Sequence, residues 1–144
     1  MWTLDEITGV IINESLMIHK KLGPGLLESV YESVLERALQ RRQLVVERQK
    51  PVRIEYEGIV FEEGFRADLI VEEQVVLEIK SVEKINAIHC KQLLTYLRLL
   101  NLSVGLLLNF GAPTLKEGTK RIVNQLHPSQ SPTLRINRSH LRDE

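Results

Sequence analysis

Residues 66–80 read RADLIVEEQVVLEIK, and this stretch does most to decide the fold class. Two apolar runs flank a short acidic segment, a pattern that predicts two antiparallel strands joined by a hairpin. Residues two apart in a strand share a face, so Glu78 and Lys80 should point the same way. If the hairpin centres on Glu73, Asp68 lies directly opposite Glu78. A slip of one residue would put the two carboxylates on opposite faces.

Two carboxylates that face each other across a hairpin repel, which destabilises the strand pair. A divalent cation reverses that effect, and Mg²⁺ in proteins usually takes one or two carboxylates together with water and phosphate oxygens. A lysine two residues along would face the attacking water and the scissile phosphate. Asp68, Glu78 and Lys80 therefore suit a metal-dependent hydrolase. On these three residues alone, a solvated, salt-bridged hairpin face is an open alternative.

The segment before this hairpin predicts two helices. Thr3 and Glu6 form a capping-box pattern ahead of a helix that should run to about Leu22 and stop at Gly23-Pro24-Gly25. A second helix should begin near Leu26. Its expected inward residues are Leu27, Val30, Val34, Leu35, Ala38 and Leu39. Its expected solvated residues are Glu32, Glu36, Arg37 and Arg41.

The remaining pattern predicts strands around one further helix. Alternation over 52–56, a turn at Glu57-Gly58 and a long strand over 59–71, interrupted near Gly64, precede the strand that carries Glu78. A helix over 86–101 and a strand over 103–110, almost wholly apolar at 104–108, then predict a crossover connection and a parallel strand pair. Residues 118–125 fit either a last strand or a short helix. The expected class is α/β, a mixed sheet flanked by helices.

Composition limits the class of protein. The chain has 144 residues, 19 basic and 19 acidic side chains, and 43% apolar residues, which indicates one ordinary globular domain. Zero net charge argues against a strongly basic nucleic-acid binder but not against a nuclease. One cysteine excludes an internal disulfide. We see no signal peptide or membrane-spanning run, so a cytoplasmic location is expected. The predicted domain covers 1–126, followed by a polar tail over 127–144.

Several motifs in order resemble a known family. The segment Gly25-Leu26-Leu27-Glu28-Ser29-Val30-Tyr31 matches the signature of the GxxExxY proteins, a bacterial group within the PD-(D/E)xK nuclease superfamily. The resemblance continues through 64–68, 78–80, 92–96 and 109–111, and so covers most of the chain apart from the polar tail. Ala67 stands where the proline that gives the superfamily its name would precede Asp68.

The resemblance implies a restriction-endonuclease-like core and a set of roles. Asp68 and Glu78 correspond to the metal-binding acids and Lys80 to the catalytic lysine. Glu28 corresponds to a helical acid that assists the metal and the reaction. The implied cofactor is Mg²⁺ or Mn²⁺, and the implied activity is hydrolysis of phosphodiester bonds in nucleic acid, with DNA as the expected partner. A homodimer would suit such an enzyme, because two sites can cut both strands.

Gln92 and Tyr96 correspond to a QxxxY motif that lies near the catalytic site in RecB-like nucleases. The residues themselves leave other readings open: Glu28 as an exposed acid in a first helical turn, Gln92 as a surface amide, and Tyr31 and Tyr96 as aromatics at the edge of the core. The alternative function is a non-catalytic module on the same fold that binds nucleic acid or another protein.

Overall fold

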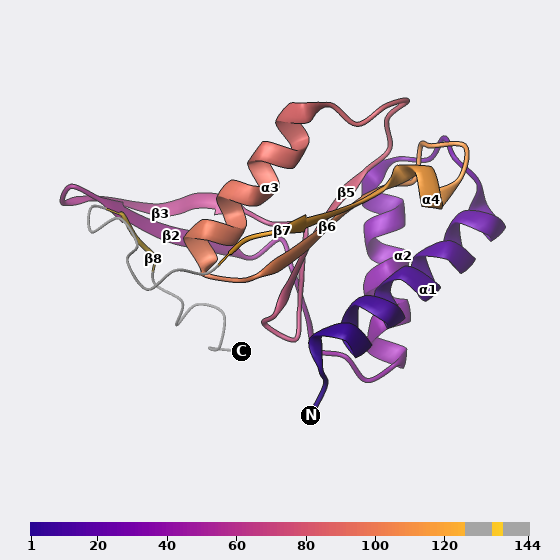
Figure 1. The fold of residues 1–144 in the computed structure, drawn as a ribbon, viewed down its shortest axis with the longest axis horizontal. Coiled ribbons are helices and arrows are strands. Elements are labelled where there is room, and N and C mark those ends of the chain that lie inside the picture. The colour runs from indigo at the N-terminus through magenta and orange to yellow at the C-terminus, as the bar shows by residue number, and fades with distance from the viewer. Residues whose placement is uncertain (126–133, 137–144) are drawn as a thin grey trace.

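A computed structural model of the protein describes residues 1–125 and 134–136, and Figure 1 shows its arrangement. It confirms the α/β class, with a mixed five-stranded sheet in the order β1-β4-β5-β6-β7. A second, three-stranded sheet has the order β3-β2-β8. The predicted polar tail over 127–144 lies outside the described residues except for 134–136.

The predicted elements occur in the predicted order, and further short elements over 46–48, 115–118 and 134–136 come in addition to them. The helices are α1 (Leu4–Leu22), α2 (Glu28–Arg41), α3 (Ala87–Leu100) and the short α4 (Leu115–Gly118). The strands of the main sheet are β1 (Val46–Arg48), β4 (Leu69–Val71), β5 (Val75–Lys80), β6 (Val104–Asn109) and β7 (Thr119–Val123). Those of the second sheet are β2 (Pro51–Tyr56), β3 (Ile59–Arg66) and β8 (Leu134–Ile136). The pair β5–β6 is parallel, as the α3 crossover predicts, and the other pairs are antiparallel.

The first helix begins and ends where local chemistry predicts. The Oγ1 atom of Thr3 accepts from the Glu6 amide at 3.2 Å, and Glu6 Oε2 accepts from the Thr3 amide at 2.9 Å, which is a complete capping box. Gly23 ends the helix with φ +71°, a left-handed conformation that costs glycine little. The sharp turn that follows brings α2 back against α1 (Figure 1).

The main sheet is buried on both faces. On β5 the side chains of Val75, Leu77 and Ile79 belong to the core formed with α1 and α2. Val76 belongs to a second core formed with α3 and the base of the β2–β3 hairpin. Strict alternation along β5 therefore serves two cores, which explains why the strand reads as almost wholly apolar. Glu78 shares the face of Val76 and is only 4% exposed.

The predicted single strand over 59–71 is wrong. Strand β3 ends at Arg66 and β4 begins at Leu69, and the two strands belong to different sheets. The break falls at Ala67-Asp68 rather than near Gly64. Gly64 instead lies beside Ile54, whose Cδ1 would be 2.0 Å from an added Cβ, next to an irregularity in the β2–β3 register. Alternation continues through both strands, so the pattern carries no signal for the change of sheet.

The predicted buried face of α2 needs correction as well. The helix starts at Glu28 rather than Leu26, and Val30 and Val34 are each 38% exposed. Glu32, expected to be solvated, is buried at 6% exposure. A carboxylate is buried only where donors satisfy it, and those for Glu32 come from Arg48 at the end of β1 and from Gln49 directly after it. The expectation that charged helix residues face solvent fails for Glu32 because its hydrogen-bond partners lie outside the helix.

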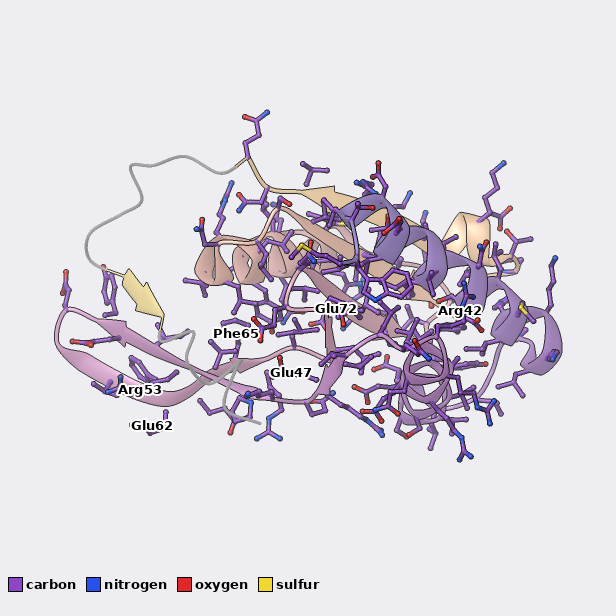
Figure 2. The ribbon with its side chains drawn as sticks, turned by 90° about the horizontal axis from the view of Figure 1, so that it is seen from below. Arg42, Glu47, Arg53, Glu62, Phe65 and Glu72 are labelled. Carbon is purple, nitrogen blue, oxygen red and sulfur yellow. The ribbon has the colours of Figure 1, made fainter. Side chains whose placement is uncertain are left out.

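The β2–β3 hairpin projects beyond α3, away from α1 and α2 (Figure 1). At its far part Arg53 and Glu62 lie side by side, with Arg53 Nε 3.4 Å from Glu62 Oε1 (Figure 2). Tyr56, Ile59 and Phe61 of this hairpin are about half exposed. Among the described residues, no helix has the length and apolarity needed to cross a membrane.

Candidate active site

The register of the β4–β5 hairpin is the one that brings Asp68 opposite Glu78. Leu69 pairs with Leu77 and Val71 with Val75, so the hairpin is centred on Glu73. Three residues form the loop, and two of them, Glu72 and Glu73, have left-handed φ values of 53° and 54°. The odd loop length confirms the predicted register and keeps both carboxylates on one face.

Asp68 and Glu78 are joined by a reciprocal pair of contacts. The Asp68 amide donates to Glu78 Oε2 at 3.1 Å, and the Ile79 amide donates to Asp68 Oδ2 at 2.7 Å. Asp68 lies just before β4, where the chain passes from one sheet to the other. Each of the two carboxylates thus accepts a hydrogen bond from a backbone amide, and Asp68 accepts a further one from a neutral side chain, that of Gln49.

Burial raises the pKa of Glu78 to about 9. The charge of Asp68 and a hydrogen bond between the two side chains raise the Glu78 pKa further, whereas the charge of Lys80 lowers it. At neutral pH and without a cation, Glu78 therefore keeps a proton that lies against Asp68. A divalent cation stabilises two adjacent carboxylates in the same way as that proton, and more strongly.

Lys80 and Tyr96 flank this acidic pair. Lys80 is half-buried at the end of β5, on the face of Glu78. Tyr96 comes from α3 and stacks on Phe65 with ring centroids 4.3 Å apart. Burial raises the pKa of Tyr96, and the charges of Glu78 and Asp68 raise it further. Its hydroxyl is thus a hydrogen-bond donor near the acids over the whole neutral range.

Glu28 and Asp68 line the same pocket, which has a volume of about 520 Å³ and lies between α2 and the end of β5. Glu28 is the first residue of α2, and its Oε2 accepts from the Ser81 amide at 3.3 Å. Gln92 is exposed on α3, one helical turn before Tyr96, and makes no hydrogen bond within the described residues. Its predicted role would need a substrate to reach it.

Two residues of the site escaped sequence reasoning. Glu32 and Gln49 line the pocket, and Gln49 Nε2 donates to both Glu32 Oε1, at 2.7 Å, and Asp68 Oδ1, at 2.9 Å. Burial raises the pKa of Glu32, while its hydrogen bond from Gln49 lowers it. Glu32 is four residues after Glu28, so the two residues lie on the same face of a helix, and this spacing could have indicated that Glu32 belongs to the site. Gln49 follows a three-residue strand and carries no comparable signal.

The donor set suits a hard, oxygen-binding cation. Within residues 1–125 and 134–136 no three His, Cys, Asp or Glu side chains are grouped so that they could hold a metal ion. Mg²⁺ and Mn²⁺ sites commonly need only one or two carboxylates, with water and substrate oxygens completing the set. Asp68 and Glu78 are such a pair, placed next to each other by two hydrogen bonds from backbone amides. Glu28 stays a predicted ligand.

A comparison with protein families agrees with this geometry. A family model described as the PD-(D/E)XK nuclease superfamily matches residues 5–122. The matched range includes every predicted site residue and ends before the tail. The match is to the superfamily, so assignment to the GxxExxY proteins stays a prediction. No curated protein and no solved structure matches the chain.

Proposed function

Because the chain belongs to the PD-(D/E)XK nuclease superfamily, we propose that it is a Mg²⁺- or Mn²⁺-dependent nuclease that hydrolyses phosphodiester bonds in DNA. The observation that carries the proposal is the Asp68–Glu78 pair, two carboxylates fixed against each other by backbone amides beside a lysine. When both carboxylates are ionised they repel each other, and a bound cation relieves that repulsion.

Asp68 and Glu78 would hold the metal ion, with Glu28 assisting from the pocket that it shares with Asp68. When bound, the ion supplies Lewis-acid polarisation of the scissile phosphate and of the attacking water. Lys80 carries a positive charge on the same face and stabilises negative charge on the phosphate. The neutral hydroxyl of Tyr96 would donate a hydrogen bond to the substrate. Gln92, exposed on α3, would contact the DNA and position it.

The test is cleavage of labelled single- and double-stranded DNA in Mg²⁺, Mn²⁺ or EDTA. Lys80→Ala and Asp68→Asn should abolish metal-dependent cutting while the circular dichroism spectrum is kept. Lys116→Ala is the matched control, because it removes an exposed lysine of α4. Cutting that survives in Lys80→Ala, or that persists in EDTA, contradicts the proposal.

A second candidate function, a protein-interaction module, is favoured by the β2–β3 hairpin. Its far part exposes Tyr56, Ile59 and Phe61 beside acidic side chains, a combination that suits a protein partner better than DNA. If wild type cuts no substrate, a search for that partner is the next experiment. A homodimer would satisfy both functions, and sedimentation of the full chain tests it.

A further inference from the structure

Gln49 occupies a special place in the chain. It lies between β1 and β2, where the chain leaves the main sheet for the second one, and Asp68 lies between β3 and β4, where the chain returns. The Gln49 amide donates to the Asp68 carbonyl at 3.0 Å, so the two crossing points are tied by their backbones. Gln49 has φ +50°, a left-handed conformation that is unfavourable for a residue with a side chain. In this conformation its backbone amide and its side chain both bond to other segments of the chain.

The Gln49 side chain uses both of its N–H groups on carboxylates. Nε2 lies 2.9 Å from Asp68 Oδ1 and 2.7 Å from Glu32 Oε1. The opposite orientation of the amide would put its oxygen against two carboxylate oxygens, so the direction of these bonds is set by chemistry. Because the amide is neutral, it fixes Asp68 without cancelling the negative charge that a cation needs.

Glu32 anchors the Gln49 side chain. It is 6% exposed on α2, and its second oxygen, Oε2, lies 3.4 Å from Arg48 Nη2. With Gln49 on Oδ1 and the Ile79 amide on Oδ2, the Asp68 carboxylate is held from both sides. Its rotation is thus restricted before any ligand arrives, which lowers the entropy lost on binding.

We propose that Gln49, anchored by Glu32, is a positioning residue that orients the Asp68 carboxylate for a divalent cation. The proposal rests on the proposed function in that Asp68 is taken as a ligand. Outer hydrogen bonds of this kind contribute about 10–100-fold to metal affinity in proteins. Gln49 itself touches neither metal nor substrate and is not a catalytic residue.

The test uses Gln49→Met, which keeps the length of the side chain and removes both donors. Gln43→Met is the matched control, because Gln43 also has a left-handed backbone, with φ +65°, but is exposed and outside the pocket. Glu32→Met is a second variant that keeps the length of the side chain and removes the oxygen that accepts from Gln49, and it is used if Gln49→Met does not fold. The probe is Mn²⁺ alone, followed by electron paramagnetic resonance of the free ion.

Gln49→Met and Glu32→Met should weaken Mn²⁺ binding by about 10–100-fold, and Gln43→Met should leave it unchanged. A second readout needs no metal. The Ile79 amide proton donates to Asp68, so its NMR chemical shift should move in Gln49→Met and Glu32→Met but not in Gln43→Met.

The two readouts separate failure of this proposal from failure of the proposed function. If wild type binds no Mn²⁺, the proposed function fails, and the Ile79 shift alone decides whether Gln49 positions Asp68. An Ile79 shift that is the same in wild type and Gln49→Met overturns the positioning role, whatever the Mn²⁺ result. If wild type binds Mn²⁺ and Gln49→Met binds it with the same affinity, the positioning role is overturned as well.

Discussion

Asp68 and Glu78 are held together from both directions: the Asp68 amide donates to Glu78, and the amide of the next residue after Glu78 donates back to Asp68. Each backbone donor favours a negative oxygen, yet two negative oxygens repel, and the burial of Glu78 reduces the screening of its charge by water. The pair is therefore poised to take up a proton or a cation. Its behaviour with pH, metal and substitution follows from this relationship.

The stability of the metal-free protein should fall as pH rises. The folded-state pKa of Glu78 is raised to about 9 from 4.5, so its contribution is fully present below about pH 4.5 and is lost as pH rises through about 9. Glu78→Gln has no proton to lose in this range. As pH rises across this window, its free energy of unfolding relative to that of wild type should therefore increase by up to about 1.4 kcal/mol per pH unit. Urea unfolding in EDTA at pH 5, 7 and 9 measures it. Parallel curves for Glu78→Gln and wild type would contradict the prediction, and Glu57→Gln, at an exposed turn, is the control.

Divalent metal should reverse that loss. At pH 8, Mg²⁺ or Mn²⁺ at a hundred times its dissociation constant should raise the free energy of unfolding of wild type by about 2.7 kcal/mol. Asp68→Asn and Glu78→Gln should show little gain, since each keeps the shape of its side chain but not its charge. Thermal unfolding with and without metal gives the answer, and equal stabilisation of wild type and both variants would mean that the ion binds elsewhere.

Tyr31, the tyrosine of the GxxExxY pattern, should contribute to the stability of the fold. Its ring is fully buried and stacks on Phe110 with centroids 4.5 Å apart, and its hydroxyl donates to the Gly23 carbonyl and accepts from the Leu26 amide at 3.2 Å. Tyr31→Phe leaves those two groups unpaired and should cost about 1–3 kcal/mol. Because this loop leads into Glu28, metal affinity should also fall. A variant as stable as wild type in urea would show that water replaces the hydroxyl.

Tyr96→Phe and Gln92→Ala should separate two roles on α3. Tyr96→Phe keeps the stack on Phe65 and removes the donor near the acids, so the cleavage rate should fall by about 10²-fold with stability almost unchanged. Gln92→Ala removes an exposed amide and should raise KM for DNA with little effect on kcat. Steady-state cleavage kinetics distinguish the two variants. A change of KM in Tyr96→Phe and of kcat in Gln92→Ala would contradict the roles given to these residues.

Substitution of alanine for glycine should change stability in opposite directions at Gly111 and Gly9. A Cβ on Gly111 would lie 2.3 Å from the Val82 carbonyl oxygen, in a turn that Asn109 also binds, so Gly111→Ala should destabilise by about 1–3 kcal/mol or more. Gly9 lies on the exposed side of α1 with nothing within 4 Å, and Gly9→Ala should stabilise by about 1 kcal/mol. Thermal unfolding of both variants is the measurement. A destabilised Gly9→Ala would point to a contact on that face of α1.

Much of the fold is readable from local pattern. The capping box at Thr3, the apolar strand β6 after α3 and the odd-numbered loop around Glu73 each depend on residues close in sequence. The loop matters most, because alternation and loop length together place Asp68 and Glu78 on one face without any knowledge of the rest of the chain. The order of these elements then limits the fold to a mixed sheet with helices on it.

The break at Ala67-Asp68 and the burial of Glu32 are decided only by the tertiary structure. A strand keeps the same dihedral angles and alternation when it passes into another sheet, so residues 59–71 carry no mark of the crossing. A carboxylate on a helix is solvated or buried according to whether donors reach it, and those for Glu32 come from Arg48 and Gln49. Local sequence therefore determined which acids face each other, whereas contacts between distant segments decided what surrounds them, because hydrogen bonds depend on position in space rather than on spacing along the chain.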